Sequence, residues 1–261
     1  LKVLLDAGRH YLARQRRSLG VSDDELIKIA VRTLGLDELT PFDPKQRVIE
    51  YAIRDASTKR LVDRTLQEFT HETASESPAP GGGSVSAAVG AFGAALGAMV
   101  ANLSSHKRGW DERWLEFSEG AESGMRCHDE LLGLVDEDTE AFNLIMAAWR
   151  ADESVRDAEI LAATKNAIEV PLRVMRTALE GKDVCEAMAE RGMAASLSAA
   201  AVGALCLRTA VLGAGLNVRI NAKDLADTAA RDAYLAEATE LEDAARRREA
   251  ALVESVSARL G

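Results

Sequence analysis

The sequence predicts an all-α protein: a multi-helical bundle with small-residue helix packing, preceded by a small α+β remnant of an upstream domain. From residue 61 onward, apolar side chains recur at helical spacing. Residues 77–106 contain no Asp, Glu, Lys or Arg, although the chain is 28% charged. Only 4% of the residues are aromatic, so Ala, Gly and aliphatic side chains must fill the core. These observations indicate helices that approach one another closely.

The first 60 residues differ in pattern from the rest. Residues 1–17 and 22–35 read as helices, and Ser22 with Glu25 forms a capping-box pattern at the start of the second. A proline-bearing turn at 40–44 and a short strand at 48–53 are expected next. We predict that residues 1–54 end an upstream domain, 55–60 form a linker and 61–261 form the helical domain. Because the chain begins at Leu1 directly in helical sequence, we expect a fragment of a longer protein.

The helical domain is expected to contain seven helices. Pro171 should kink its helix and free the carbonyl near Ala167. The expected ranges are 61–73, 84–103, 111–150, 152–179, 182–191, 198–220 and 227–260.

Two of these helices have one face of large side chains and one of small side chains. Over 84–103, the large-residue face comprises Val85, Val89, Phe92, Leu96, Met99 and Leu103, and the small-residue face Ser86, Gly90, Gly93, Gly97 and Ala101. Over 198–220, the large-residue face comprises Val202, Leu205, Thr209, Leu212 and Leu216, and the small-residue face Gly203, Cys206, Ala210, Gly213 and Asn217. The first helix is long enough to span a bilayer. Its Ala and Gly centre and its two faces instead favour a buried helix, packed within one subunit or across a dimer, with no membrane span.

Charge and cysteine content exclude several classes. A net charge of −10 disfavours nucleic-acid and anionic-membrane partners. The three cysteines show no C-x-x-C pair and the four histidines no metal-binding spacing, so no metal site is expected. Unpaired thiols are typical of a cytoplasmic protein.

Asp138 is the candidate catalytic residue. It lies within an apolar stripe on the helix predicted at 111–150, whereas Asp136 and Glu137 point elsewhere and are expected to be solvated. Burial raises the pKa of a carboxyl group, which suits general acid–base catalysis. The alternative is a structural carboxylate bonded to a Ser or Asn of a neighbouring helix. The stripe comprises Leu131, Val135, Asp138, Phe142 and Ile145.

Five further residues are candidates for substrate binding. Gly82, Gly83 and Ser84 precede or open a helix, where backbone N–H groups can face an anion. The alternative is a flexible loop with Ser84 as the helix cap. Asn217 and Asn221 lie one turn apart and can bond either to a heterocycle or to a partner helix.

Several segments together resemble the formimidoyltetrahydrofolate cyclodeaminase and methenyltetrahydrofolate cyclohydrolase family, over residues 61–261. The segments are SPAPGGGSVSAAVGAFGAALGAMVANLSSHKRGW, LLGLVDEDTEAF, ATKNAIEVPLRVM and GALCLRTAVLGAGLNVRIN. The segment LLDAGRHYLARQRRSLGVSDDELIKIAVRTLGLDELTPFDPKQRVIEY resembles the C-terminal end of glutamate formimidoyltransferase.

The resemblance implies a helical, dimerising domain that binds folate, with or without a polyglutamate tail, in a cleft. It implies that Asp138 is the catalytic aspartate and that no cofactor is needed beyond the tetrahydrofolate substrate. The implied reaction converts 5-formimidoyltetrahydrofolate to 5,10-methenyltetrahydrofolate and ammonia in histidine degradation. The alternatives are a methenyltetrahydrofolate cyclohydrolase and a non-catalytic dimerisation domain. Met193 and Ala199 depart from the family pattern, where Asn and Asp are expected.

Overall fold

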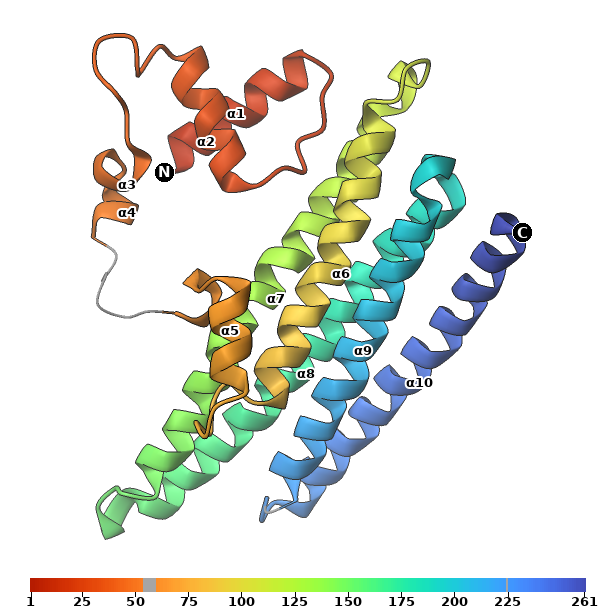
Figure 1. The fold of residues 1–261 in the computed structure, drawn as a ribbon. Helices are drawn as coiled ribbons and strands as arrows, with labels where there is room; N and C mark the ends of the chain where they lie inside the picture. The colour runs from red at the N-terminus through yellow and green to blue at the C-terminus, as the bar shows by residue number, and fades with distance from the viewer. Residues whose placement is uncertain (54–59, 224) are drawn as a thin grey trace.

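A computed structural model describes residues 1–53, 60–223 and 225–261. These residues form an all-α structure with no strand in the described part (Figure 1). Short 3-10 helices cover Leu61–Asp63, Asp111–Arg113 and Ala194–Ser196. The α-helices are α1 (Lys2–Arg14), α2 (Asp23–Thr33), α3 (Pro44–Arg47), α4 (Ile49–Ala52), α5 (Leu66–Thr73), α6 (Gly82–Ser105), α7 (Trp114–Ala148), α8 (Glu153–Arg191), α9 (Leu197–Ala222) and α10 (Thr228–Leu260).

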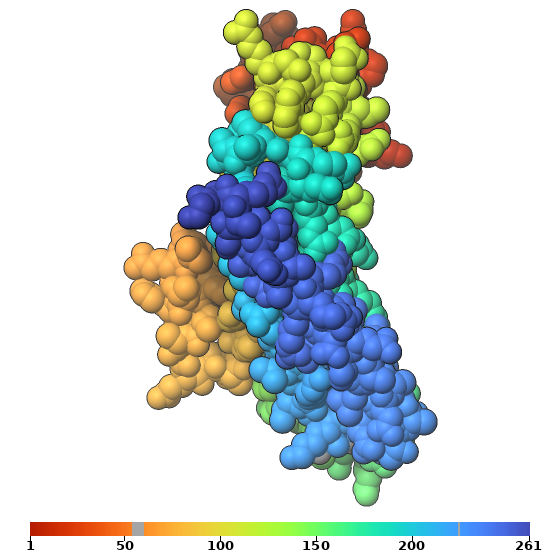
Figure 2. All heavy atoms as spheres, turned by 90° about the vertical axis from the view of Figure 1, so that its right-hand side faces the viewer, coloured from red at the N-terminus to blue at the C-terminus, as the bar shows by residue number. Residues whose placement is uncertain are grey.

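Helices α6 to α9 form an antiparallel bundle, and α10 lies along its outside against α9 and α8 (Figures 1 and 2). The start of α6, the second half of α7, the first half of α8 and the end of α9 lie toward one end, in the lower part of Figure 1. This topology brings together residues that are far apart in the sequence.

The small-residue faces of α6 and α9 pack against each other within one chain. A Cβ on Gly93 would lie 2.7 Å from the carbonyl oxygen of Gly203, so only glycine allows this approach. The large-residue faces are not buried in the chain: Phe92 is 55% exposed and Leu216 is 68% exposed. The prediction of close packing is therefore confirmed, but each helix buries one face rather than both.

By length and apolar composition alone, α6 and α9 pass the test for a membrane-spanning helix. In their most apolar windows, however, 61% of the α6 residues and 50% of the α9 residues are buried inside the protein. Such burial is characteristic of core helices in a bundle.

The N-terminal segment contains helices where a strand was predicted. The prediction of a strand at 48–53 is wrong, because α4 occupies this stretch and α3 directly precedes it. Asp43 caps α3 by accepting a hydrogen bond from the Lys45 N–H, and Pro44 takes the first helical position, where proline is favourable. The helix predicted after Ser22 is confirmed as α2. Most of the predicted 55–60 linker lies outside the described residues.

Helix α8 replaces the two helices predicted at 152–179 and 182–191. It continues through both Pro171 and Gly181. A Cβ on Gly181 would lie 3.1 Å from Leu207 Cδ2, so this glycine provides space for a neighbouring helix and does not end its own.

Candidate active site

Asp138 lies in the second half of α7, on the side that faces α6. Its Oδ2 accepts two hydrogen bonds from Ser84, one from the backbone N–H at 2.8 Å and one from the hydroxyl at 2.9 Å. The flanking Asp136 is directed elsewhere, as predicted, but it is not merely solvated: it accepts a hydrogen bond of 2.6 Å from the Leu61 N–H. Ser84 therefore fixes one oxygen of the candidate catalytic carboxylate.

Gly83 allows the carboxylate to approach α6. A Cβ at this position would overlap all three carboxylate atoms of Asp138. Gly83 and Ser84 are both buried, and they lie in the first turn of α6, where backbone N–H groups have no intrahelical partner. The glycine-rich sequence predicted that an anion binds at the start of this helix. The carboxylate of Asp138 occupies that position.

Two opposing effects set the proton affinity of Asp138. Burial raises the pKa of its carboxyl group above the usual range, while the hydrogen bonds from Ser84 lower it by a smaller amount. The positive end of the α6 dipole also favours the ionised form. A raised pKa makes the carboxylate a stronger base, and a pKa closer to the working pH favours a group that must both accept and return a proton.

A cavity of about 160 Å³ lies beside this carboxylate. It is lined by Pro78, Ala79, Gly81, Gly82, Asp138, Thr139, Ala141, Phe142, Ile145, Ala167, Asn217 and Asn221. A larger hollow, of about 1470 Å³, lies among the N-terminal helices and residues 60–68. The smaller cavity is the candidate active site, because it contains a half-buried carboxylate with a raised pKa.

Two known protein-family models match this chain, and one of them covers the cavity. The family model described as Formiminotransferase-cyclodeaminase matches residues 65–240, which include every residue that lines the cavity. The chain belongs to the formiminotransferase-cyclodeaminase family. A second model, described as Formiminotransferase domain, matches residues 1–54.

Individual members of the family agree with this assignment. The formimidoyltransferase-cyclodeaminase of Rattus norvegicus is 35% identical over 234 residues, which cover 87% of this chain and 43% of the relative. The methenyltetrahydrofolate cyclohydrolase of Methylorubrum extorquens is 36% identical over 181 residues, 67% of this chain and 87% of the relative. A crystal structure of formiminotetrahydrofolate cyclodeaminase from Thermotoga maritima matches with a TM-score of 0.70 and 29% identity, covering 76% of this chain and 98% of that one. The chain spans less than half the length of the bifunctional relatives it matches.

In this chain, the predicted site residues fall into two groups. Asp138, Gly82, Asn217 and Asn221 line the cavity. Gly83 and Ser84 do not line it but stand behind the carboxylate, where they contact Asp138. Their predicted role in substrate binding stays a prediction, whereas their contact with Asp138 is direct.

Thr139 is a polar lining residue that the sequence reasoning missed. Its Oγ1 lies 3.3 Å from the Ser84 hydroxyl oxygen. Because the Ser84 proton is directed at Asp138, Thr139 acts as the donor in this pair. Its position directly after Asp138 was a signal that could have indicated it.

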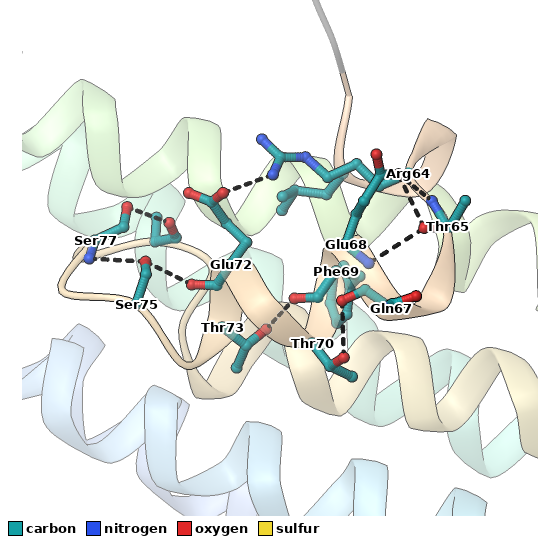
Figure 3. Close-up of polar contacts among 12 residues, drawn as sticks. Arg64, Thr65, Gln67, Glu68, Phe69, Thr70, Glu72, Thr73, Ser75 and Ser77 are labelled. Atoms are coloured by element: carbon teal, nitrogen blue, oxygen red, sulfur yellow. Dashed lines mark hydrogen bonds and ion pairs between the residues drawn. The ribbon is translucent and has the colours of Figure 1, made fainter.

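The loop that closes one side of the cavity follows α5. Thr65 and Glu68 form a reciprocal capping box at the start of α5, and Glu72 near its end pairs with Arg64 at 2.6 Å (Figure 3). After α5, the Ser77 hydroxyl donates to the carbonyl of Ala79 at 2.6 Å (Figure 3). The Ser77–Ala79 contact lies within the 74–81 loop, whose last residues line the cavity.

Met193 and Ala199, which depart from the expected family pattern, lie at the opposite end of the bundle. Ala199 packs against the cluster around Phe117 and Leu197. At 1.5 Å per residue, it lies about 27 Å along α9 from Asn217. Within one chain, these two substitutions therefore do not touch Asp138. Helix α9 begins at Leu197, with Ser196 before it, so it starts one residue earlier than the predicted range.

Among the described residues, the possible metal ligands and the two most buried cysteines do not indicate a second reactive site. Among the described residues, no group of three His, Cys, Asp or Glu side chains is placed to hold a metal ion. Burial raises the pKa of the Cys127 thiol to about 11 and that of Cys185 to about 12, which disfavours the reactive thiolate.

Proposed function

We propose that this chain carries the cyclodeaminase activity of its family and converts 5-formimidoyltetrahydrofolate to 5,10-methenyltetrahydrofolate and ammonia. The observation that carries the proposal is the Asp138 carboxylate, held at the start of α6 and presented to a cavity. The family assignment and the Thermotoga maritima structure support the same reaction. No cofactor beyond the folate substrate is required.

The reaction needs one group that moves a proton over a short distance. Nitrogen 10 attacks the carbon of the protonated formimidoyl group, and a bond forms between them. The bond from that carbon to the exocyclic nitrogen then breaks, and ammonia leaves with the proton that nitrogen 10 has lost. Asp138 accepts this proton from nitrogen 10 and returns it to the leaving nitrogen.

The environment of Asp138 suits both halves of this transfer. Burial raises the pKa of its carboxyl group, and this makes the carboxylate a better base than an exposed aspartate. Ser84 holds Oδ2, and this leaves Oδ1 for the substrate. The carboxylate charge also favours the cationic methenyl product.

A second candidate is the methenyltetrahydrofolate cyclohydrolase reaction, in which water opens the same ring. The Methylorubrum extorquens relative favours it, because the match covers 87% of that protein. The match of residues 1–54 to a formiminotransferase domain favours the cyclodeaminase instead, since it links the two activities in one chain. A third reading, a non-catalytic scaffold, is disfavoured because the cavity beside Asp138 is not filled by side chains.

The test is to incubate the protein with 5-formimidoyltetrahydrofolate and to follow methenyl absorbance and ammonia release together. Cyclohydrolase activity is measured in parallel as the decay of added methenyltetrahydrofolate. Asp138→Asn should lower the rate by about 100-fold or more. Asp129→Asn, on an exposed side chain of the same helix, is the matched control and should retain the rate. An inactive wild type refutes the proposal, and full activity of Asp138→Asn refutes the role of this residue.

We also propose that the domain forms a homodimer or a higher homo-oligomer through the large-residue faces of α6 and α9. Phe92, Met99 and Leu103 on α6 and Val202, Leu205 and Leu216 on α9 are exposed, although the two helices are the most apolar in the chain. Several exposed large apolar side chains on two neighbouring helices are typical of a subunit interface. Leu205→Asp should convert the oligomer to a smaller species in light scattering, whereas Leu161→Asp should not. The two leucines are matched in exposure, at 39% and 40%. Equal masses for both variants and the wild type refute the interface.

The wider biological role follows from the same site. We propose a cytoplasmic enzyme of histidine degradation and one-carbon metabolism, working next to an upstream formimidoyltransferase domain. The match to a formiminotransferase domain over residues 1–54 supports that partner, and the three free cysteines support the location.

A further inference from the structure

The backbone carbonyl of Ala167 on α8 lacks the usual helical hydrogen-bond donor four residues later. In an α-helix, each carbonyl accepts from the N–H four residues later. For Ala167 that residue is Pro171, which has no N–H, yet α8 continues through it. Both residues are buried. A buried carbonyl without a partner costs stability, so a donor from elsewhere is needed.

Asn221 on α9 supplies this donor. Its side-chain Nδ2 lies 2.7 Å from the Ala167 carbonyl oxygen. The contact determines which end of the amide is nitrogen, because a carbonyl oxygen only accepts. The Oδ1 atom accepts no hydrogen bond within the described part of the chain. Since Ala167 and Asn221 both line the cavity beside Asp138, this oxygen is left for a ligand there.

Asn217 is oriented in a similar way, but its contact has a different basis. Its Nδ2 donates to the carbonyl of Gly213 at 3.0 Å, on the same helix. That carbonyl also has the normal helical partner, the backbone N–H of Asn217, and so does not depend on the side chain. The two amides lie one helical turn apart, and each has its nitrogen engaged. Both residues line the cavity, and in each the amide oxygen is the end left available as an acceptor.

We propose that Pro171 is a positioning residue of the folate site. By contributing no N–H to α8, it reserves the Ala167 carbonyl for Asn221 and holds the Asn221 Oδ1 as an acceptor. The ligand groups that match two adjacent acceptors are the ring N–H and amino donors of a reduced pterin. This inference rests on the proposed function, from which it takes its ligand.

The test is a double-mutant cycle with Pro171→Ala and Asn221→Ala in the full chain. The measurements are KM and kcat for 5-formimidoyltetrahydrofolate, the Kd for tetrahydrofolate by calorimetry, and Tm. Pro171→Ala returns an N–H to the Ala167 carbonyl and so weakens the hold on Asn221. It should raise KM and Kd about fivefold, with kcat within twofold and Tm not lowered. Asn221→Ala should raise KM and Kd at least as much and lower Tm by about 3 °C, because the carbonyl loses its donor.

The double variant distinguishes a coupled pair from two independent changes. When Pro171→Ala is added to Asn221→Ala, Tm should return to the wild-type value, and KM and Kd should stay at the values of Asn221→Ala alone. Asn217→Ala is the control for coupling: the effects of Pro171→Ala on KM and Kd should be the same with and without it. The inference is overturned if Pro171→Ala leaves KM and Kd unchanged in the wild-type background, or if its effects multiply with those of Asn221→Ala. Absence of turnover with tetrahydrofolate binding intact refutes the proposed reaction alone, and absence of any folate binding refutes both.

Discussion

Gly83 is the residue on which the position of the Asp138 carboxylate depends, and Gly83→Ala is the variant that tests this dependence. The added Cβ would overlap the carboxylate, so either the α6 backbone or the Asp138 side chain must move. A moved carboxylate loses its contacts with the Ser84 N–H and hydroxyl. The change is therefore one methyl group, placed where it breaks two hydrogen bonds.

The magnitude follows from these contacts. A hydrogen bond to a charged group contributes about 1.5–3 kcal/mol, and overpacking costs about 1–3 kcal/mol. Replacing glycine by alanine in a helix returns up to about 1 kcal/mol, and a displaced carboxylate recovers some hydration. We expect a net destabilisation of about 2 kcal/mol, which corresponds to a Tm lower by about 4–8 °C. Catalysis should fall by about 100-fold, because the carboxylate no longer lies where the proton is transferred.

The matched control is Gly133→Ala on α7. Gly133 is exposed, and a Cβ there would lie 3.9 Å from the nearest atom, Glu137 Oε1. This substitution should stabilise the protein by about 0.5–1 kcal/mol and leave the rate unchanged. The assays are thermal unfolding followed by circular dichroism, and methenyl formation from 5-formimidoyltetrahydrofolate. If Gly83→Ala behaves like Gly133→Ala in both, then the close approach of Asp138 to α6 is not what holds the carboxylate, and the reasoning is refuted.

Three other predictions concern buried titratable groups. Folding raises the pKa of Asp138, so the folded state binds the proton more tightly and the ionised group costs stability above that pKa. Asp138→Asn should therefore have a higher Tm than wild type at pH 7, with a difference that disappears below about pH 4; a difference independent of pH contradicts this. The ammonium group of Lys182 is buried, with its Nζ 2.9 Å from the Ala245 carbonyl oxygen, and burial lowers its pKa to about 8. Wild-type stability should rise from about pH 8 to pH 10, and Lys182→Met should abolish this rise in denaturant titrations; an unchanged rise refutes the assignment. In the native protein, a maleimide reagent should label half-buried Cys206 well before buried Cys185, and equal rates in mass spectra would contradict this order.

The partly buried position of Asp138, the candidate catalytic carboxylate, could be predicted from sequence because its signal is local. An acidic residue within an apolar stripe of a long helix must either find partners or be protonated, whatever the neighbouring helix is. The partner itself, Ser84, could not be deduced in this way. Its backbone N–H is available because Ser84 lies in the first turn of α6, and the alternative prediction made Ser84 the cap of this helix.

The incorrect predictions of secondary structure and burial have a common physical cause. A local sequence pattern does not show which neighbouring helices pack against a segment. The β-branched residues at 48–53 favour a strand, but a strand needs a partner, and the described residues contain none. The predicted helices 152–179 and 182–191 were separated around Gly181, although this glycine lies within α8 and gives space to Leu207. The large-residue face of α6 looked like a buried seam. Periodicity reveals that a helix has two faces, but not whether this chain or a second copy covers them.

The position of Asp138 at the start of α6 also bears on the reaction proposed above. A helix N-terminus in a folate enzyme would be expected to bind an anionic group of the substrate. Here the protein's own carboxylate takes that position and neutralises the positive end of the helix dipole. Asp138 lines the cavity together with Asn217 and Asn221, whose amide oxygens we propose as acceptors for the ligand. An amidinium that becomes a methenyl cation, on a ring rich in N–H donors, is complementary to that surface at every stage of the reaction.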